Sequence, residues 1–308
     1  MKIPYSKMCR VFRDPRGLIR VTKRFFAMWN PGILDPGGRR WKTKYVSVPL
    51  YRTLGAVIPT FKNSEFSSFF GEHEYIFEWI AKNGSDFVIV DIGAGDGISQ
   101  SNVAKSIYYY RLDAILVEGN GLKFSQLALN YQTYDNVSLV KSFVTRDNVA
   151  GLIDSSRLNG ANYVLSLDID SYDLYVMESI LLINPPALVC LEWNPLFRPP
   201  VEFSVTPNYT TGWRGDWFWG ASIESWNQML NRFDYGITTV LGVSFFAEPR
   251  SSGRRFLTSD EVYKVYFEQV NRLAVPGETD GTSNFNNSKY IRSLLDEYPN
   301  LFTTNLLL

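Results

Sequence analysis

The sequence has very few of the residues that build disulfide frameworks and zinc centres. Its 308 residues include two cysteines, Cys9 and Cys190, and one histidine, His73. Two distant cysteines and one histidine supply neither the ligand set of a zinc site nor a set of disulfide bridges. Such scarcity is typical of proteins from reducing compartments, and Cys190, which lies in an apolar run, is expected to be a small core residue.

The sequence also lacks a hydrophobic run long enough to span a bilayer, and its first residues lack the apolar core of a secretion signal. Its 31 Lys and Arg residues are balanced by 31 Asp and Glu residues, so the formal net charge is zero. A neutral molecule has no overall attraction to nucleic acid or to an anionic membrane. We therefore expect a cytoplasmic protein with no nucleic-acid partner.

The positive charge is concentrated at the N-terminus. Residues 1–44 hold twelve Lys or Arg residues against two acids, Asp14 and Asp35. Apolar residues interleave with these charges, and a short amphipathic helix is expected over about Leu18–Met28. Residues 1–70 are read as a basic extension. Two roles stay open for residues 1–44: a solvated arm packed on the domain, or contact with an anionic surface, either a membrane or a polyanionic glycan.

From about residue 87 the chain alternates short apolar, β-branched runs with helical segments, which predicts a parallel sheet covered by helices on both faces. A helix at Ile223–Arg232 then precedes two runs joined by so short a link that only an antiparallel hairpin fits. The prediction is an α/β, Rossmann-like domain over residues 71–250, with five parallel strands and a C-terminal antiparallel hairpin. Residues 251–308 are read as a helical appendage, with helices at Ser259–Leu273 and Ser288–Glu297. The expected strands are Phe87–Asp91, Ala114–Glu118, Val137–Phe143, Val164–Asp168 and Ala187–Trp193, and the hairpin is Gly236–Leu241 with Ser244–Glu248.

A glycine-rich turn follows the first expected strand. The segment Val90–Gly97 reads VDIGAGDG and leads towards a helical segment. Glycines allow a tight strand-to-helix turn and close approach of a ligand to the backbone. Glu118 ends the second strand, where an acid can bind ribose hydroxyls. The candidate cofactor-binding residues here are Asp91, Gly93, Ala94, Gly95, Asp96, Gly97, Glu118, Gly119 and Asn120.

Two kinds of cofactor suit such a turn. A nicotinamide dinucleotide usually needs the spacing GxGxxG and room for a pyrophosphate, whereas this turn reads GxGxG and is flanked by Asp91 and Asp96. These carboxylates would repel a pyrophosphate. S-adenosylmethionine carries a sulfonium and an ammonium and has no phosphate, so nearby carboxylates suit it. The alternative is a glycine turn with no ligand.

The chain resembles the FkbM-like, class I S-adenosylmethionine-dependent methyltransferases of bacterial glycan biosynthesis. The resemblance covers about Gly71–Glu248 and depends on VDIGAGDG (90–97), LVEGN (116–120), LSLDIDSYDLYVMESIL (165–181), ALVCLEWNP (187–195), GASIESW (220–226) and VSFFAEP (243–249). It departs from the family at Ser166, where lysine is frequent, and at Asn194, where histidine is frequent. The resemblance implies O-methylation, often of a sugar hydroxyl.

Acids end the fourth and fifth expected strands. Asp168 and Asp170 follow the fourth, and Glu192 and Asn194 follow the fifth. Ligands of open parallel sheets bind at this edge. Three roles stay open: Asp170, Glu192 and Asn194 hold a cation such as Mg²⁺; an acid removes the acceptor proton; or Asp168 and Asp170 cap the next helix. We name Asp168, Asp170 and Glu192 as candidate catalytic residues, and Asp168 also as a cofactor contact.

Two further segments are candidates for ligand contact. Glu72 and His73 lie just before the first strand, in an entry segment that covers the cofactor in many methyltransferases; Glu72 is a candidate cofactor contact, and the lone histidine is read as structural. The long segment Pro195–Gly220 is rich in aromatic residues, and two roles stay open for it: binding the face of a sugar, or forming a local core that covers the end of the sheet. The candidate substrate-binding residues are Asn194, Arg198, Trp213, Trp217 and Trp219.

Together these features predict an S-adenosylmethionine-dependent O-methyltransferase that acts on a hydroxyl of a sugar or glycan. A non-catalytic Rossmann-like subunit of a glycan-assembly complex is the alternative, and a nicotinamide oxidoreductase is a weaker third reading.

Overall fold

The structure, a computed structural model, describes residues 66–84, 86–153, 158, 160–207, 218–273 and 302–305. The predicted helices Leu18–Met28 and Ser288–Glu297, and the basic residues 1–44, lie outside this part of the chain. None of the helices in the described ranges is both long and apolar enough to cross a membrane.

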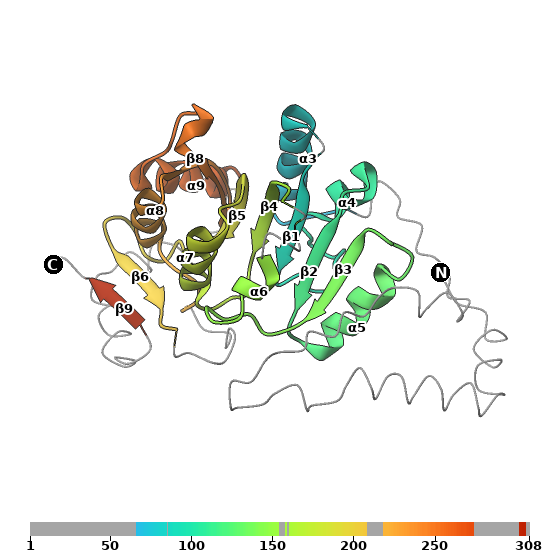
Figure 1. Cartoon of the computed structure of the whole chain (residues 1–308). Coiled ribbons are helices and arrows are strands. Elements are labelled where there is room, and N and C mark those ends of the chain that lie inside the picture. The colour runs from blue at the N-terminus through green and yellow to red at the C-terminus, as the bar shows by residue number, and fades with distance from the viewer. Residues whose placement is uncertain are drawn as a thin grey trace, which may run out of the picture. The chain divides into compact units, whose positions relative to one another are not determined.

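A seven-stranded sheet forms the centre of the domain. Its order is β3-β2-β1-β4-β5-β8-β7, which Figure 1 shows from β3 on the right to β8 on the left. The first five strands are parallel, and β8 runs antiparallel between β5 and β7. This confirms the predicted Rossmann-like sheet with a terminal hairpin. The strands are β1 (Val88–Ile92), β2 (Ala114–Glu118), β3 (Val137–Lys141), β4 (Tyr163–Leu167), β5 (Leu188–Glu192), β7 (Tyr235–Leu241) and β8 (Ser244–Pro249).

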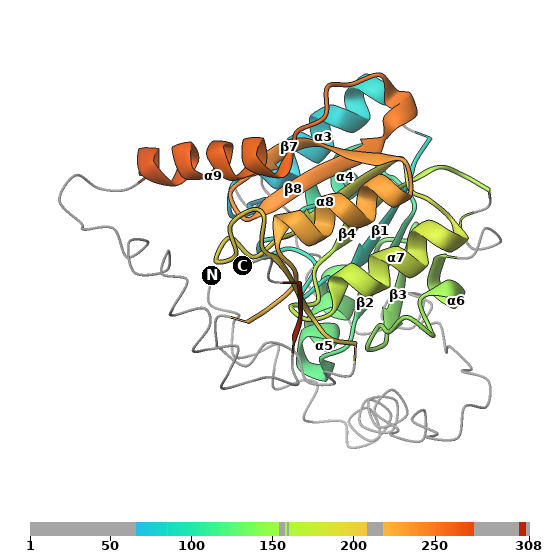
Figure 2. The ribbon, with the colours of Figure 1, turned by 90° about the vertical axis from the view of Figure 1, so that its left-hand side faces the viewer.

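Helices cover both faces of this sheet. They are α3 (Glu72–Asn83), α4 (Ala104–Tyr110), α5 (Gly121–Asn130), α6 (Ala150–Ile153), α7 (Asp173–Ile183), α8 (Ile223–Arg232) and α9 (Ser259–Leu273). Figure 2 shows α7 and α8 alongside each other over the sheet. Side chains alternate along a strand, so Val88, Val90 and Ile92 face the layer of α6, α7 and α8, while Ile89 and Asp91 face the opposite side.

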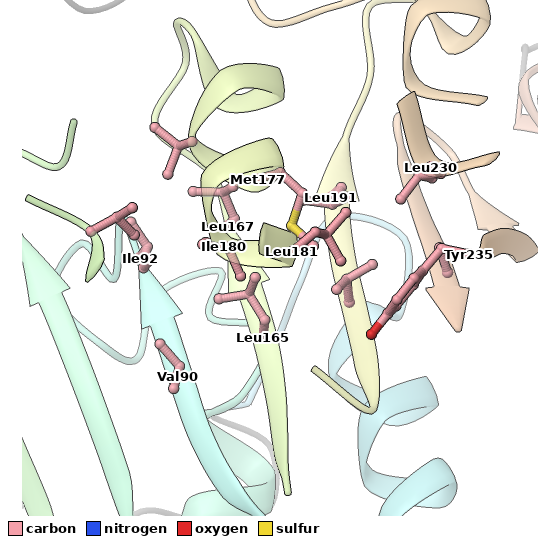
Figure 3. Packing of buried hydrophobic residues seen from close by; sticks show 14 of the residues in the cluster. Val90, Ile92, Leu165, Leu167, Met177, Ile180, Leu181, Leu191, Leu230 and Tyr235 are labelled. Atoms are coloured by element: carbon pink, nitrogen blue, oxygen red, sulfur yellow. The ribbon is translucent and has the colours of Figure 1, made fainter. Parts of the chain in front are cut away.

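The main core lies between the sheet and α7. Met177, Ile180 and Leu181 of α7 project towards Leu165 and Leu167 of β4, as Figure 3 shows. All five side chains are at most 4% exposed. Continuous burial on both faces explains why the parallel strands read as unbroken apolar runs instead of alternating polar and apolar residues. This core fixes the ends of β4 and β5, where the predicted acids lie.

Helix α9 is packed against this domain. Val262 is fully buried in the main core, and Leu257 forms an isolated bridge with Ile237 of β7. Gln269 donates to the carbonyl oxygen of Val240 at 2.9 Å and accepts from the amide of Gly242 at 2.8 Å. The helix predicted within an appendage therefore contacts the turn between β7 and β8 at the carboxyl end of β5.

A second sheet has only two strands. β6 (Glu202–Val205) pairs antiparallel with β9 (Phe302–Asn305). The sequence predicted neither strand, because β6 falls in the aromatic segment and β9 in a region read as helical. Phe203 of β6 stacks on Phe197, with ring centroids 3.8 Å apart. The aromatic segment thus has a small core of its own, formed by Leu196, Phe197, Phe203, Val205 and Phe218.

Candidate functional site

The glycine turn packs directly against the end of β4. The amides of Gly93 and Ala94 both donate to the carbonyl oxygen of Val117, at 2.9 and 3.0 Å. Gly93 has φ +92°, and a Cβ atom there would lie 1.7 Å from the carbonyl oxygen of Asp168. Only glycine fits this position. The close approach brings the turn and the acid at residue 168 to the same edge of the sheet.

Helix α5 holds the turn from behind. The Tyr131 hydroxyl donates to the carbonyl oxygen of Gly97 at 2.7 Å, and Asn130 donates to that of Asp96 at 2.8 Å. A Cβ atom on Gly97, whose φ is +77°, would lie 2.4 Å from Leu127. By contrast, a Cβ atom on Gly95 would meet nothing within 4 Å. The turn is therefore fixed on one side and presents bare backbone on the other.

Glu118 is bonded to the turn itself. Its Oε2 accepts from the amide of Gly95 at 2.9 Å, and its Oε1 accepts from the amide of Asn120 at 2.5 Å. The side chain of Asn120 in turn caps α5, accepting from the amides of Leu122 and Lys123. Each carboxylate oxygen of Glu118 keeps a further lone pair. The predicted contact with a ribose would use these remaining positions.

Asp96 folds the turn locally. Its carboxylate accepts from the amides of Ile98 at 2.9 Å and Ser99 at 2.7 Å, and from the Ser99 hydroxyl at 2.7 Å. Burial raises the pKa of Asp96, but these hydrogen bonds outweigh it and leave the pKa below its ordinary value. The structure thus gives Asp96 a role in shaping the loop, and its predicted contact with a cofactor stays a prediction.

Asp91 lies beneath the turn and is 5% exposed. Burial and the nearby charge of Glu118 raise its pKa to about 7, while a hydrogen bond from Ser166 opposes the rise. Asn102 donates to the Ser166 hydroxyl at 3.4 Å and contacts the Cys190 sulfur at 3.7 Å. These side chains form a polar row under the site, and Cys190 is buried, as expected.

The predicted acids come together at the ends of β4 and β5. Carboxylate oxygens of Asp168, Asp170 and Glu192 all lie within 4.8 Å of one another. Burial raises the pKa of Asp168 and of Glu192, and repulsion within the cluster raises both further. Protein atoms surround these carboxylates closely, yet Asp168 and Asp170 remain reachable by solvent. The cluster therefore favours protons or cations and repels anions.

Asp173 builds the loop that carries the cluster. Its buried carboxylate accepts from the amides of Ile169 at 2.8 Å and Ser171 at 2.9 Å. Burial raises its pKa to about 6, and these hydrogen bonds oppose the rise. The N-cap of α7 is Tyr172, with no side-chain cap, so Asp168 and Asp170 do not cap this helix. Asp170 has φ +56°, a conformation that aspartate and asparagine tolerate better than most residues.

Asn194, predicted to bind metal or substrate, has a side chain that is hydrogen-bonded to the main chain, and its predicted role stays a prediction. Its side chain is 2% exposed; its Nδ2 donates to the carbonyl oxygen of Trp219, and its Oδ1 accepts from the amide of Leu196, both at 3.0 Å. Its own amide donates to Ala221 at 2.8 Å. Asn194 therefore closes the base of the aromatic segment.

The entry segment lies near the carboxyl end of β5. Glu72 is 2% exposed and accepts from the amide of Phe70 at 2.8 Å, and its charge raises the pKa of Cys190 and Glu192. The Phe70 ring lies against Gly242 in the turn between β7 and β8. This places Glu72 within electrostatic reach of the acid cluster.

His73 has a structural environment, as expected. Its Nδ1 is 2.7 Å from the Ser68 hydroxyl, and its backbone amide donates to the same oxygen at 3.2 Å. Burial lowers its pKa, and the neighbouring Glu74 opposes this change. The ring is held near the start of α3.

Of the predicted substrate-binding residues, Arg198 is exposed and contacts Tyr263 of α9. Trp213 and Trp217 lie outside the described residues, and Trp219 is half-buried. The sequence did not single out Phe143 and Leu122, which are 72% and 73% exposed. A Cβ atom on Gly119 would lie 2.4 Å from the Phe143 ring, so this ring covers the residue next to Glu118. Phe143 is the last residue of the run predicted as the third strand and lies two residues beyond the end of β3, which was the only available signal.

No family model and no curated protein matches the sequence. Among solved structures, the chain is similar to an S-adenosylmethionine-dependent methyltransferase from Clostridium acetobutylicum, with 9% identity over 59% of this chain and 93% of that chain and a TM-score of 0.38. It is also similar to the N-terminal domain of EvdMO1 in the presence of SAH and D-fucose, with 10% identity over 60% of this chain and 85% of that chain and a TM-score of 0.40. A third similar structure is M. jannaschii TYW2 in complex with AdoMet, with 10% identity over 57% of this chain and 73% of that chain and a TM-score of 0.32.

Proposed function

We propose that this chain is an S-adenosylmethionine-dependent O-methyltransferase whose acceptor is a hydroxyl of a sugar or glycan. The observation that carries the proposal is the junction at Gly93. Three features meet there at one edge of the sheet: the glycine turn, Glu118, which is proposed to bind ribose hydroxyls, and the cluster of Asp168, Asp170 and Glu192. This is the edge at which open parallel sheets bind ligands.

The chemistry of these residues fits the cofactor. The exposed Phe143 ring lies against Gly119 and offers a surface for a flat aromatic base, and Leu122, three residues after Gly119, is exposed as well. The free lone pairs of Glu118 would accept hydrogen bonds from ribose hydroxyls. The anionic cluster suits the sulfonium and ammonium of S-adenosylmethionine and disfavours the pyrophosphate of a dinucleotide. The negative charge of Glu72, near the same cluster, would strengthen the preference of the site for a positively charged ligand.

The bound cofactor would supply an already activated methyl group. The protein then has to align the acceptor oxygen with the methyl carbon and remove a proton. The oxygen–carbon bond would form as the carbon–sulfur bond breaks, and the hydroxyl proton would pass to a carboxylate. Asp170 is the group we assign to this role, because it is solvent-reachable and its pKa is raised by burial, which strengthens it as a base.

The finer assignment to the FkbM-like proteins of glycan biosynthesis remains part of the proposal, supported by the segments at residues 165–181 and 187–195. Pro195, the first residue of the aromatic segment, is three residues after Glu192, and this proximity in the chain supports a sugar acceptor. A contact of residues 1–44 with an anionic surface remains a prediction from their charge alone.

Calorimetry tests the proposal directly. We expect S-adenosylhomocysteine to bind at micromolar levels and NAD not to bind. Glu118→Ala should weaken binding by about 1–3 kcal/mol, because charged acceptors of ribose hydroxyls are lost. Glu178→Ala, a change at a surface ion pair with Arg146 and Arg232, is the matched control and should leave affinity unchanged. Tight NAD binding, or no response to S-adenosylhomocysteine, would refute the assignment. A chain that binds the cofactor but transfers no methyl group to any acceptor would instead be the non-catalytic subunit.

A further inference from the structure

An arginine is held in a fixed position beyond the carboxyl end of β5. Arg198 lies in the segment that Asn194 anchors, six residues after Glu192. Its side chain is exposed to solvent but is held by contacts with Tyr263. Its Nε donates to the Tyr263 hydroxyl at 2.7 Å, and its guanidinium carbon lies 5.1 Å from the centre of the Tyr263 ring.

Tyr263 is itself fixed by the core. Its ring packs edge-on against Trp193, with ring centroids 6.2 Å apart, and Tyr266 packs against Trp193 in the same way at 5.2 Å. Trp193 is fully buried and directly follows Glu192. The position of Arg198 is therefore tied to the strand end that carries the acid cluster.

The remaining nitrogen atoms of Arg198 have no partner among the described residues. Among the described residues only Nε has a hydrogen-bond partner, and no carboxylate of these ranges lies within ion-pair distance of Arg198. The two terminal amino groups form a planar fork that matches the two oxygens of a carboxylate or phosphate. Because stacking on Tyr263 already restricts the side chain, little rotational freedom is lost when such a group binds.

We propose that Arg198, positioned by Tyr263, binds an oxyanion of the acceptor, and that the acceptor is an acidic sugar carrying a carboxylate or a phosphate. This inference rests on the proposed methyl transfer. Asp168, Asp170 and Glu192 repel anions, so the oxyanion lies at Arg198, away from the cluster, while an uncharged hydroxyl of the same molecule approaches the cluster. The two ends of the site thus select an acceptor that is charged at one end only.

The experiment uses the full chain saturated with S-adenosylhomocysteine. The probes are methyl glucoside, the corresponding methyl glucuronide, glucose 6-phosphate and inorganic phosphate, each titrated by ligand-observed NMR at low and at moderate salt. We expect at least one acidic sugar to bind about tenfold or more tightly than methyl glucoside, as a charge-assisted pair predicts. Comparing the glucuronide with glucose 6-phosphate distinguishes carboxylate from phosphate recognition, and inorganic phosphate reports the contribution of the anion alone.

Arg198→Gln should abolish this preference, and Tyr263→Phe should reduce it, because the ring remains and the hydroxyl is lost. Arg255→Gln is the matched control, since Arg255 is an exposed arginine paired with Glu261. Equal binding of neutral and acidic sugars, no binding of any acidic sugar up to about 10 mM, or an unchanged preference in Arg198→Gln would overturn the proposal. Titration of S-adenosylhomocysteine beforehand separates these results from a failure of the methyltransferase assignment, which would appear as no cofactor binding.

Discussion

Replacing Asp170 with asparagine separates a chemical role of this carboxylate from a structural one. Asparagine has the same shape and tolerates the φ of +56° at this position, so the backbone has no reason to move. The carboxylate oxygens of the cluster lie within 4.8 Å of one another. Two ionised groups at that distance repel by about 0.9 kcal/mol with water-like screening and about 3.5 kcal/mol at an effective dielectric constant of 20. Because Asp170 is exposed, the lower figure applies.

The free energy of unfolding should therefore stay constant or rise by up to about 1 kcal/mol in Asp170→Asn. Turnover, followed as conversion of S-adenosylmethionine to S-adenosylhomocysteine with a responding acceptor, should fall by about a hundredfold or more if Asp170 takes the proton. Asp173→Asn is the contrasting variant. Its buried carboxylate accepts two amide hydrogen bonds, and losing one should cost about 1–3 kcal/mol of stability. A destabilised Asp170→Asn with normal turnover would refute the reasoning.

Three other predictions test the site. Gly93→Ala should abolish S-adenosylhomocysteine binding in calorimetry, because its Cβ atom would lie 1.7 Å from the Asp168 carbonyl oxygen; normal affinity would contradict the geometry of the turn. Burial raises the pKa of Asp91 from 3.8 to about 7, so its contribution to stability is present below pH 3.8 and is lost as the pH rises towards 7. Denaturation of the ligand-free protein should show stability falling across this window, and Asp91→Asn should flatten the profile; an unchanged profile would show that Asp91 is not responsible. Turnover should survive EDTA, because proton transfer to Asp170 requires no metal ion, and loss of activity that Mg²⁺ restores would establish a metal enzyme instead.

The sequence predicted the central sheet well because its signals are local. Apolar runs such as Ala114–Glu118 are strands with the same bounds in the structure, and the short link after Leu241 required a hairpin. β6 and β9 were missed because each consists of four residues, and the partner that stabilises each one is almost a hundred residues away in the chain. No local pattern records such a pairing.

The candidate site was predicted in position more than in detail. That Asp168, Asp170 and Glu192 converge follows from their places at the ends of neighbouring strands. The spacing of three acids at residues 168, 170 and 173 could not indicate which of them organises the loop, and the structure assigns that role to Asp173. The sequence also could not indicate that the Asn194 side chain is bonded to the main chain of Trp219 and Leu196, because the path of the segment between them was not predicted.

The pairing of β6 with β9 has a consequence for the order in which the protein forms during synthesis. All strands of the large sheet precede residue 250, so the cofactor side can fold while the chain is still being made. β6 has to wait for Phe302–Asn305, which follow it by almost a hundred residues and leave the ribosome after every strand of the large sheet. Closing so long a loop is also slow compared with forming a local hairpin. A nascent chain should therefore acquire the ability to bind its cofactor before the aromatic segment gains its second strand.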